Sequence, residues 1–210
     1  MSRTLKTDIP GVDHRLSLEA LREAGVPRGL VVEIGFGRGE FLIELAQAEP
    51  SQRFLGVEIS HKRTLKMARR LARLEIGNVM LHEGPAEPLL RDALPPASVA
   101  CFWINYPDPW PKKRHHRRRL FQTETVAWLA RALEPGGLLR VATDDRDYAE
   151  WIDEHLAAEP TLANRYAPER WRDAVEGRMP TAYELEWRAL GRSLHYFEYA
   201  RGESPADPGV

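Results

Sequence analysis

The feature that most constrains the fold is a regular alternation between short apolar runs and segments with helical spacing. Each apolar run suits a buried strand, and each is followed by a segment whose apolar residues recur every three or four positions. The predicted strands are residues 30–34, 53–58, 78–82, 99–104 and 138–143, and the predicted helices are residues 40–48, 60–75, 86–93, 120–133 and 145–158. Such alternation is typical of a parallel sheet with right-handed crossovers. The sequence therefore predicts an α/β fold with a doubly wound, mostly parallel sheet and helices on both faces.

The outer parts of the chain are less regular. A length of 210 residues suits one domain with a full core, predicted here to span residues 30–201. Within it, Tyr183–Leu190 is expected to be a helix, and His195–Arg201 alternates like an edge strand. Residues 1–29 are expected to form an N-terminal arm with one short helix at Leu18–Ala24, and residues 202–210 a flexible tail.

The composition limits where the protein is expected to be located and what it is expected to bind. No apolar run approaches the roughly 18 residues of a membrane span, and the first residues lack the apolar stretch of a secretory signal. The single cysteine, Cys101, permits no internal disulfide, which fits a reducing cytoplasm. The net charge is −1, but the block Lys112–Arg119 carries six Lys and Arg, so the rest of the chain carries −7. Basicity gathered at one place predicts a local polyanion site. No metal and no obligate protein partner are expected, and a monomer and a homodimer both remain open.

The first predicted strand runs into a glycine-rich turn, the usual ligand cradle of an open α/β sheet. Glycines there let a ligand approach bare backbone, and three are present: Gly35, Gly37 and Gly39. A dinucleotide fingerprint would need a further glycine at position 40, which is Glu40. Glu33, just before the turn, would repel a pyrophosphate but suits an ammonium group, and Glu58 ends the second strand, where an acid can accept both hydroxyls of a ribose. A ligand with a ribose and an ammonium but no phosphate is S-adenosylmethionine, so a nicotinamide dehydrogenase is disfavoured.

A stiff loop follows the strand at residues 99–104. Its one acid is Asp108, and three alternating prolines reduce the entropy lost in positioning that carboxylate. Tyr106 and Trp110 offer flat faces on which a base can stack. Because the fourth strand should lie beside the first, the loop and its polar hinge, Asn105, should face the cofactor. The basic block follows directly and is interpreted as a phosphate-binding segment, with a solvated loop as the alternative.

Taken together, these segments resemble the bacterial tRNA (guanine-N7-)-methyltransferase family, over roughly residues 30 to 200. The matching segments are Glu33–Gly39, Gly56–Glu58, Pro107–His115, Thr143–Asp144 and Thr181–Glu184. The string Asp-Pro-Trp-Pro-Lys-Lys-Arg-His is highly specific, whereas the glycine turn alone would indicate only a class I methyltransferase. The resemblance implies a Rossmann-like sheet of seven strands. It also implies methyl transfer from S-adenosylmethionine to N7 of a guanine in the tRNA variable loop.

The resemblance also assigns roles by position. The family's cofactor contacts fall on Glu33, Glu58, Asp108 and Pro85, beside the three glycines. Pro85 stands where the family commonly has Asp, so backbone groups there or a neighbour such as Glu83 would hold the adenine. Substrate contacts are implied at Lys112, Asp144, Thr181, Ala182, Tyr183 and Glu184. The basic block supplies the expected RNA phosphate contacts: Lys113, Arg114, Arg117, Arg118 and Arg119.

Guanine N7 carries an in-plane lone pair and no proton, so its methylation needs no general base. The protein's task is to position the reactants and to stabilise the positive charge that develops on the base. Asp108 is the predicted catalytic residue, and either Asp108 or Asp144 can accept hydrogen bonds from the guanine edge.

Two other functions remain open. An amino-group methyltransferase would carry Asn/Asp-Pro-Pro-Tyr, which the segment Asn105–Asp108 matches only distantly, because its prolines do not stand together. A non-catalytic RNA-binding protein with a methyltransferase-like fold would not need the intact acids Glu33 and Glu58.

Overall fold

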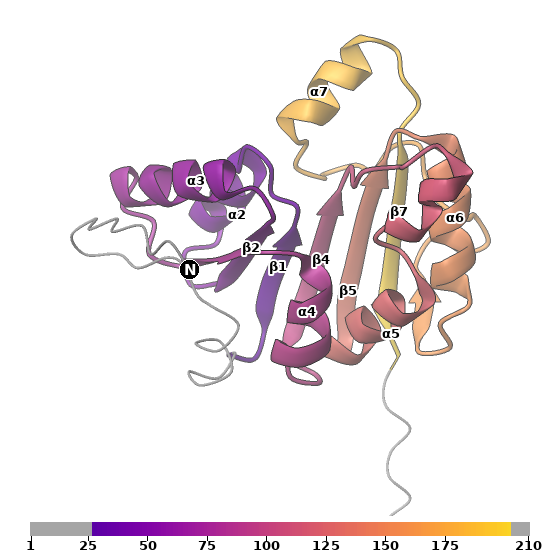
Figure 1. The fold of residues 1–210 in the computed structure, drawn as a ribbon, viewed down its shortest axis with the longest axis horizontal. Helices are drawn as coiled ribbons and strands as arrows, with labels where there is room; N and C mark the ends of the chain where they lie inside the picture. The colour runs from indigo at the N-terminus through magenta and orange to yellow at the C-terminus, as the bar shows by residue number, and fades with distance from the viewer. Residues whose placement is uncertain (1–26, 203–210) are drawn as a thin grey trace, which may run out of the picture.

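The computed structural model describes residues 27–202, in which seven strands form one sheet with helices on both faces (Figure 1). The strands are β1 (Leu30–Ile34), β2 (Phe54–Glu58), β3 (Val79–Glu83), β4 (Val99–Asn105), β5 (Leu133–Thr143), β6 (Leu162–Asn164) and β7 (His195–Arg201). The helices are α2 (Glu40–Ala48), α3 (His61–Arg73), α4 (Ala86–Pro88), α5 (Thr123–Ala132), α6 (Arg146–Ala157) and α7 (Ala182–Ala189), with a π-helical turn η1 (Leu89–Ala93) and a 3₁₀ helix η2 (Lys113–Arg118). The helix expected at Leu18–Ala24, and with it nearly all of the N-terminal arm and of the tail, lies outside the described residues.

The strand order is β3-β2-β1-β4-β5-β7-β6, with parallel pairing from β3 to β5 and antiparallel pairing of β7 with both of its neighbours. The predicted doubly wound, mostly parallel sheet is therefore confirmed. β4 lies beside β1, and Ile34 pairs with Ile104, so the two strands end together. Their common end brings the glycine turn and the Asp108 loop to the same edge of the sheet.

The prediction of an edge strand at His195–Arg201 is wrong. β7 lies between β5 and β6, and the outer position belongs to β6, a strand of three residues that the sequence pattern did not reveal. Three residues are too few to show a periodicity. The alternation along β7 is real, because Phe197 and its neighbour Tyr196 pack in two different buried clusters. The chain between β6 and β7 makes a long excursion, which carries α7 beyond the arrowheads of β4 and β5 (Figure 1).

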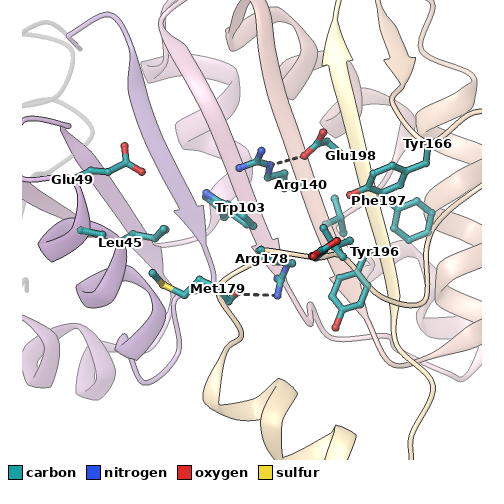
Figure 2. A pocket seen from close by; sticks show the side chains of 15 residues that line it. Leu45, Glu49, Trp103, Arg140, Tyr166, Arg178, Met179, Tyr196, Phe197 and Glu198 are labelled. Carbon is teal, nitrogen blue, oxygen red and sulfur yellow. Dashed lines mark hydrogen bonds and ion pairs between the residues drawn. The ribbon is translucent and has the colours of Figure 1, made fainter.

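The sheet separates two apolar layers. Phe102 and Ile104 of β4 pack with α4, η1, α5 and α6 on one face, and Cys101 and Trp103 pack with α2 and α3 on the other. On this second face a cavity of about 310 Å³, called here the Trp103 cavity, lies between α2, the strands β4, β5 and β7, and the loop before α7 (Figure 2). In residues 27–202, no helix is both long and apolar enough to cross a membrane.

Candidate active site

Two cavities meet at the carboxyl edge of the parallel strands, where α/β sheets bind ligands. The wide cavity, about 560 Å³, lies between the glycine turn, the Asp108 loop and the start of α7. The narrow cavity, about 330 Å³, lies between the glycine turn and the residues that follow β2 and β3. Both are lined by Gly35, Arg63 and residues 105–108, so the two cavities adjoin along the Asp108 loop.

Glu33 presents a buried carboxylate to the wide cavity. Only 3% of the residue is exposed; its Oε1 accepts a hydrogen bond from the Asn105 side-chain amide at 3.4 Å, and its Oε2 has no hydrogen-bond partner among residues 27–202. Burial raises the pKa of Glu33 to about 8, although the Asn105 hydrogen bond and the Arg178 charge oppose the rise. A buried carboxylate oxygen left without a donor is costly, and an ammonium group would satisfy it. The residues present therefore fit S-adenosylmethionine.

Glu58 fastens the glycine turn. Gly37 is left-handed at φ +57° and donates its N–H to Glu58 Oε2 at 3.0 Å, while the N–H of Ser60 donates to Oε1 at 2.9 Å. Gly35, at φ +78°, has no atom within 4 Å of the place a Cβ would take, which leaves room for a ligand against its backbone. Each Glu58 oxygen keeps a second lone pair, and Glu58 lines the narrow cavity, so a ribose can still bind there.

The remaining residues predicted to contact the cofactor differ in whether they line a cavity. Pro85 lines the narrow cavity with its neighbours Gly84, Ala86 and Glu87. Glu83 does not line it, because its carboxylate is 2.9 Å from His61 Nδ1. Of the two ways to hold the adenine, the backbone around Pro85 is thus the better placed. Gly39 lines neither cavity, and a Cβ added to it would be 2.5 Å from Met67 Sδ. Its predicted contact with the cofactor therefore stays a prediction.

The two candidate acids for the base lie differently. Asp108 is exposed and lines both cavities, at their junction. Asp144 lines only the wide cavity, where its Oδ2 is 3.4 Å from the Tyr183 hydroxyl and 3.3 Å from Arg192 Nη1. Asp108 can therefore face cofactor and base at once, whereas Asp144 can face only what enters the wide cavity.

Arg119 is buried and holds the Asp108 loop in place. It is 2% exposed; its Nε donates to the Pro109 carbonyl at 2.8 Å, its Nη2 donates to the Asp147 carboxylate, and its guanidinium lies 5.0 Å from the rings of Tyr148 and Trp151. A guanidinium bonded and stacked in this way does not reach a phosphate at the surface. The structure thus shows Arg119 holding the loop, and its predicted contact with RNA stays a prediction that this burial does not favour.

Most of the rest of the basic block forms a short exposed helix and not an irregular loop. η2 begins after Lys112 and carries four predicted phosphate contacts, all of them exposed: Lys113, Arg114, Arg117 and Arg118. The guanidinium carbon of Arg118 lies 5.0 Å from the centre of the half-buried Trp110 ring. Arg118 thereby covers one face of that ring. Lys112 is exposed and lines neither cavity, so its predicted contact with the substrate stays a prediction.

Comparison with known proteins identifies the family. Residues 27–197 match the family model described as "Putative methyltransferase". The curated tRNA (guanine-N(7)-)-methyltransferase of Leifsonia xyli is 40% identical over 90% of this chain and 84% of its own length. The one of Bordetella pertussis is 44% identical over 90% and 73%, respectively. The chain belongs to the tRNA (guanine-N7-)-methyltransferase family. It is accordingly an enzyme that uses S-adenosylmethionine, as the resemblance implied.

Solved structures place the methyltransferase among class I folds. The antibiotic-resistance methyltransferase Kmr superimposes with a TM-score of 0.60 at 20% identity, covering 90% of this chain and 94% of the other. The aminoglycoside resistance methyltransferase NpmB1 gives 0.57 at 18% identity, covering 89% and 94%. At this identity the likeness concerns the fold alone, and it confirms the Rossmann-like sheet.

The start of α7 forms the far wall of the methyltransferase's wide cavity. Three of its predicted substrate residues line that wall: Thr181, Ala182 and Tyr183. The Tyr183 ring lies 4.8 Å from the Tyr106 ring, which closes the wall against the Asp108 loop. Glu184 differs, because it is fully buried, bonded to Arg178 and absent from both cavities. The predicted direct contact of Glu184 with the substrate therefore stays a prediction, which its burial does not favour.

Sequence reasoning missed several residues of this site. Arg63, Glu186 and Arg192 line the wide cavity, and Arg178 bonds to Asn105 although 73 positions separate the two residues. No local spacing could have signalled these residues, because the chain folds them together from separate elements. The only sequence signal for Arg178 was its place three residues before the Thr181–Glu184 motif.

Proposed function

We propose that this enzyme transfers the methyl group of S-adenosylmethionine to N7 of a guanine in tRNA, at the variable loop. The observation that carries the proposal is the junction of two cavities at Asp108. On one side a buried Glu33 oxygen has no hydrogen-bond donor within residues 27–202. On the other, the exposed basic helix η2 follows the Asp108 loop. The names of the family members quoted above support the choice of guanine and tRNA.

The acidic side chains define the part of the site proposed to hold the cofactor. S-adenosylmethionine, when bound, supplies an electrophilic methyl group on a sulfonium. Glu33 pairs with the ammonium, Glu58 accepts from the ribose hydroxyls, and the backbone around Pro85 lines the adenine end. Gly35 and Gly37 leave the backbone open to this ligand.

The guanine side is the wide cavity. Tyr106 and Tyr183 supply aromatic surface beside the base, and Asp144 accepts hydrogen bonds from its N1–H and 2-amino group. Asp108 stabilises the positive charge that appears on guanine as N7 is methylated. No proton leaves N7, so no residue acts as a general base.

The direct test is incubation with bulk tRNA and labelled S-adenosylmethionine, followed by nucleoside analysis. We expect the label in 7-methylguanosine. Label in a base methylated on an exocyclic amino group would favour the amino-group alternative. Failure to bind the cofactor by calorimetry would favour the RNA-binding alternative.

The same proposal extends to setting and organisation. We place the enzyme in the cytoplasm, acting on tRNA as a monomer or homodimer. Residues 30–201 form its methyltransferase domain, which is the range over which the seven strands join one sheet.

The exposed part of the basic block should set the salt dependence of tRNA binding. Replacing Lys113, Arg114 and Arg117 with serine should weaken tRNA binding and make log affinity fall less steeply with log salt. The slope should decrease by about one for each phosphate that the variant leaves without a cation. Cofactor affinity should stay unchanged. Filter binding across a salt series measures the slope.

Arg119→Ser is the matched control within the same block. Because Arg119 is buried, this change should lower the stability of the fold and leave the salt slope of the folded protein as in wild type. An unchanged slope in the triple variant would remove η2 from the RNA interface.

A further inference from the structure

A continuous polar connection runs from Glu33 to the interior of the protein. The Asn105 Nδ2 amide group donates to Glu33 Oε1, and the Asn105 Oδ1 oxygen accepts from Arg178 Nη2 at 2.6 Å. Arginine has no acceptor atom, so Arg178 can meet only the oxygen of the Asn105 amide. The amide is thereby turned with its Nδ2 toward Glu33. Arg178 thus determines which group of Asn105 the carboxylate receives.

The same guanidinium holds the start of α7. Arg178 Nη1 donates to the Glu184 carboxylate. It also donates to the Met179 carbonyl at 3.3 Å (Figure 2). Glu184 in turn lies in the first turn of α7, where its N–H donates to Thr181 Oγ1 at 3.0 Å. The residues of α7 that line the wide cavity are therefore tied, through Glu184, to Arg178.

The position of Arg178 is enforced by packing. Its side chain is 7% exposed and lies between the rings of Tyr196, Trp103 and Phe41, with its guanidinium carbon 4.9, 5.5 and 5.9 Å from their centroids. Figure 2 shows the side chain beside Tyr196 and Met179 at the edge of the Trp103 cavity. An arginine held by aromatic rings is pre-organised, so it loses little freedom in making bonds at both ends.

We propose that Arg178 is a positioning residue that couples the two halves of the active site. One nitrogen orients Asn105 against Glu33 in the cofactor half, and another fixes Glu184 and the start of α7 in the guanine half. Binding of the cofactor at Glu33 then stabilises the wall that receives the base, and by reciprocity an ordered wall favours cofactor binding. The proposal rests on the cofactor role proposed above for Glu33.

The test uses Arg178→Lys, which keeps the charge and can still pair with Glu184. A single ammonium on a flexible stem does not reproduce the fork that serves Asn105 and Glu184 together. We expect S-adenosylmethionine affinity to fall by about fivefold or more, in the usual range of coupling effects. Hydrogen exchange should show amides 182–189 gaining protection on cofactor binding in wild type, and losing that gain in the variant. Normal affinity with a normal gain in protection would overturn the proposal.

A second variant guards against simple misfolding. Arg178→Met combined with Glu184→Gln removes both charges of this buried pair, so Glu184 is not left as a carboxylate without Arg178. Its cofactor affinity should still fall, and adding Asn105→Ala should cause no further loss, because both changes break one connection. Additive losses would mean that Arg178 acts only through packing.

Arg188→Met is the matched control. Arg188 lies 2.8 Å from the other oxygen of Glu184 and donates to the Tyr196 hydroxyl, and no bond joins it to Asn105. We expect cofactor affinity within about twofold of wild type in this variant. A loss as large as that of Arg178→Lys would assign the effect to α7 as a whole and reject Arg178 as the connection.

Glu33→Gln separates the proposed cofactor role of Glu33 from the proposed coupling role of Arg178. If this variant binds the cofactor normally, the role of Glu33 fails whatever the Arg178 variants show.

Discussion

Asp108→Ala should lower the single-turnover rate of tRNA methylation by about a hundredfold or more. Asp108 is the acid that lines both cavities, so its charge lies where the cationic base forms, and removing one preorganised electrostatic group commonly costs that much. Cofactor affinity should fall less than the rate. Rapid-quench assays with enzyme in excess over labelled S-adenosylmethionine measure the chemical step directly.

Asp108→Asn and Asp144→Ala are the informative companions. Asparagine keeps the shape and loses the charge, so a rate close to that of alanine would show that the charge matters. Asp144 touches the wide cavity only, and its removal should raise KM for tRNA or relax the choice of base more than it slows transfer. If Asp108→Ala and Asp144→Ala both stay within a few-fold of wild type, the assigned mechanism is wrong.

Glu33→Gln should weaken cofactor binding by about a hundredfold and, at pH 8, make the ligand-free protein more stable. Glutamine keeps the Asn105 hydrogen bond but offers no charge to an ammonium. The stability gain arises because burial raises the pKa of Glu33 from 4.5 to about 8. Between these values the unfolded chain binds fewer protons than the folded one, so wild-type stability falls as the pH rises. The cost above pH 8 is on the order of a few kcal/mol.

Urea unfolding of both proteins across this pH range measures the difference. Wild type and Glu33→Gln should converge near pH 4.5, where the carboxyl is protonated in the folded state, and diverge toward pH 8. Calorimetry adds a second check, because Glu33 must ionise to pair with an ammonium. Close to one proton should therefore be released when wild type binds cofactor near pH 7. Parallel stability curves together with no proton release would contradict the assignment.

The parallel half of the sheet was predictable because its signals are local. Each of the five parallel strands contains a short apolar run beside a helical pattern, and the chirality of crossovers then leaves few topologies. β5 begins at Leu133, earlier than the predicted start at residue 138, because it takes in the Pro-Gly-Gly segment that the sequence suggested was a turn. The place of β7 was not predictable in this way. Alternation along His195–Arg201 identified a strand, but which neighbours flank it depended on β6, whose three residues carry no pattern.

The site shows the same division. The glycine turn, Glu58 and Asp108 follow strand ends, and strand ends share an edge, so the sequence could bring them together. The roles of Arg119 and Glu184 could not be seen, because a charged residue in a motif looks the same whether its side chain meets solvent or a buried partner. Arg119 faces Asp147, which is 28 positions away, and only the folded chain reveals that pairing.

The place of β7 has a consequence for synthesis of the enzyme. The acids proposed to hold the cofactor lie between Glu33 and Asp108, whereas the proposed wall opposite the base comes from residues 178–190. β7 follows that segment and joins it back to β5. Domains generally fold as units, and the N-terminal residues of a domain leave the ribosome first. The nascent chain therefore carries the residues proposed for the methyl donor well before it carries those of the opposite wall. The wide cavity can be complete only after β7 has emerged and paired with β5.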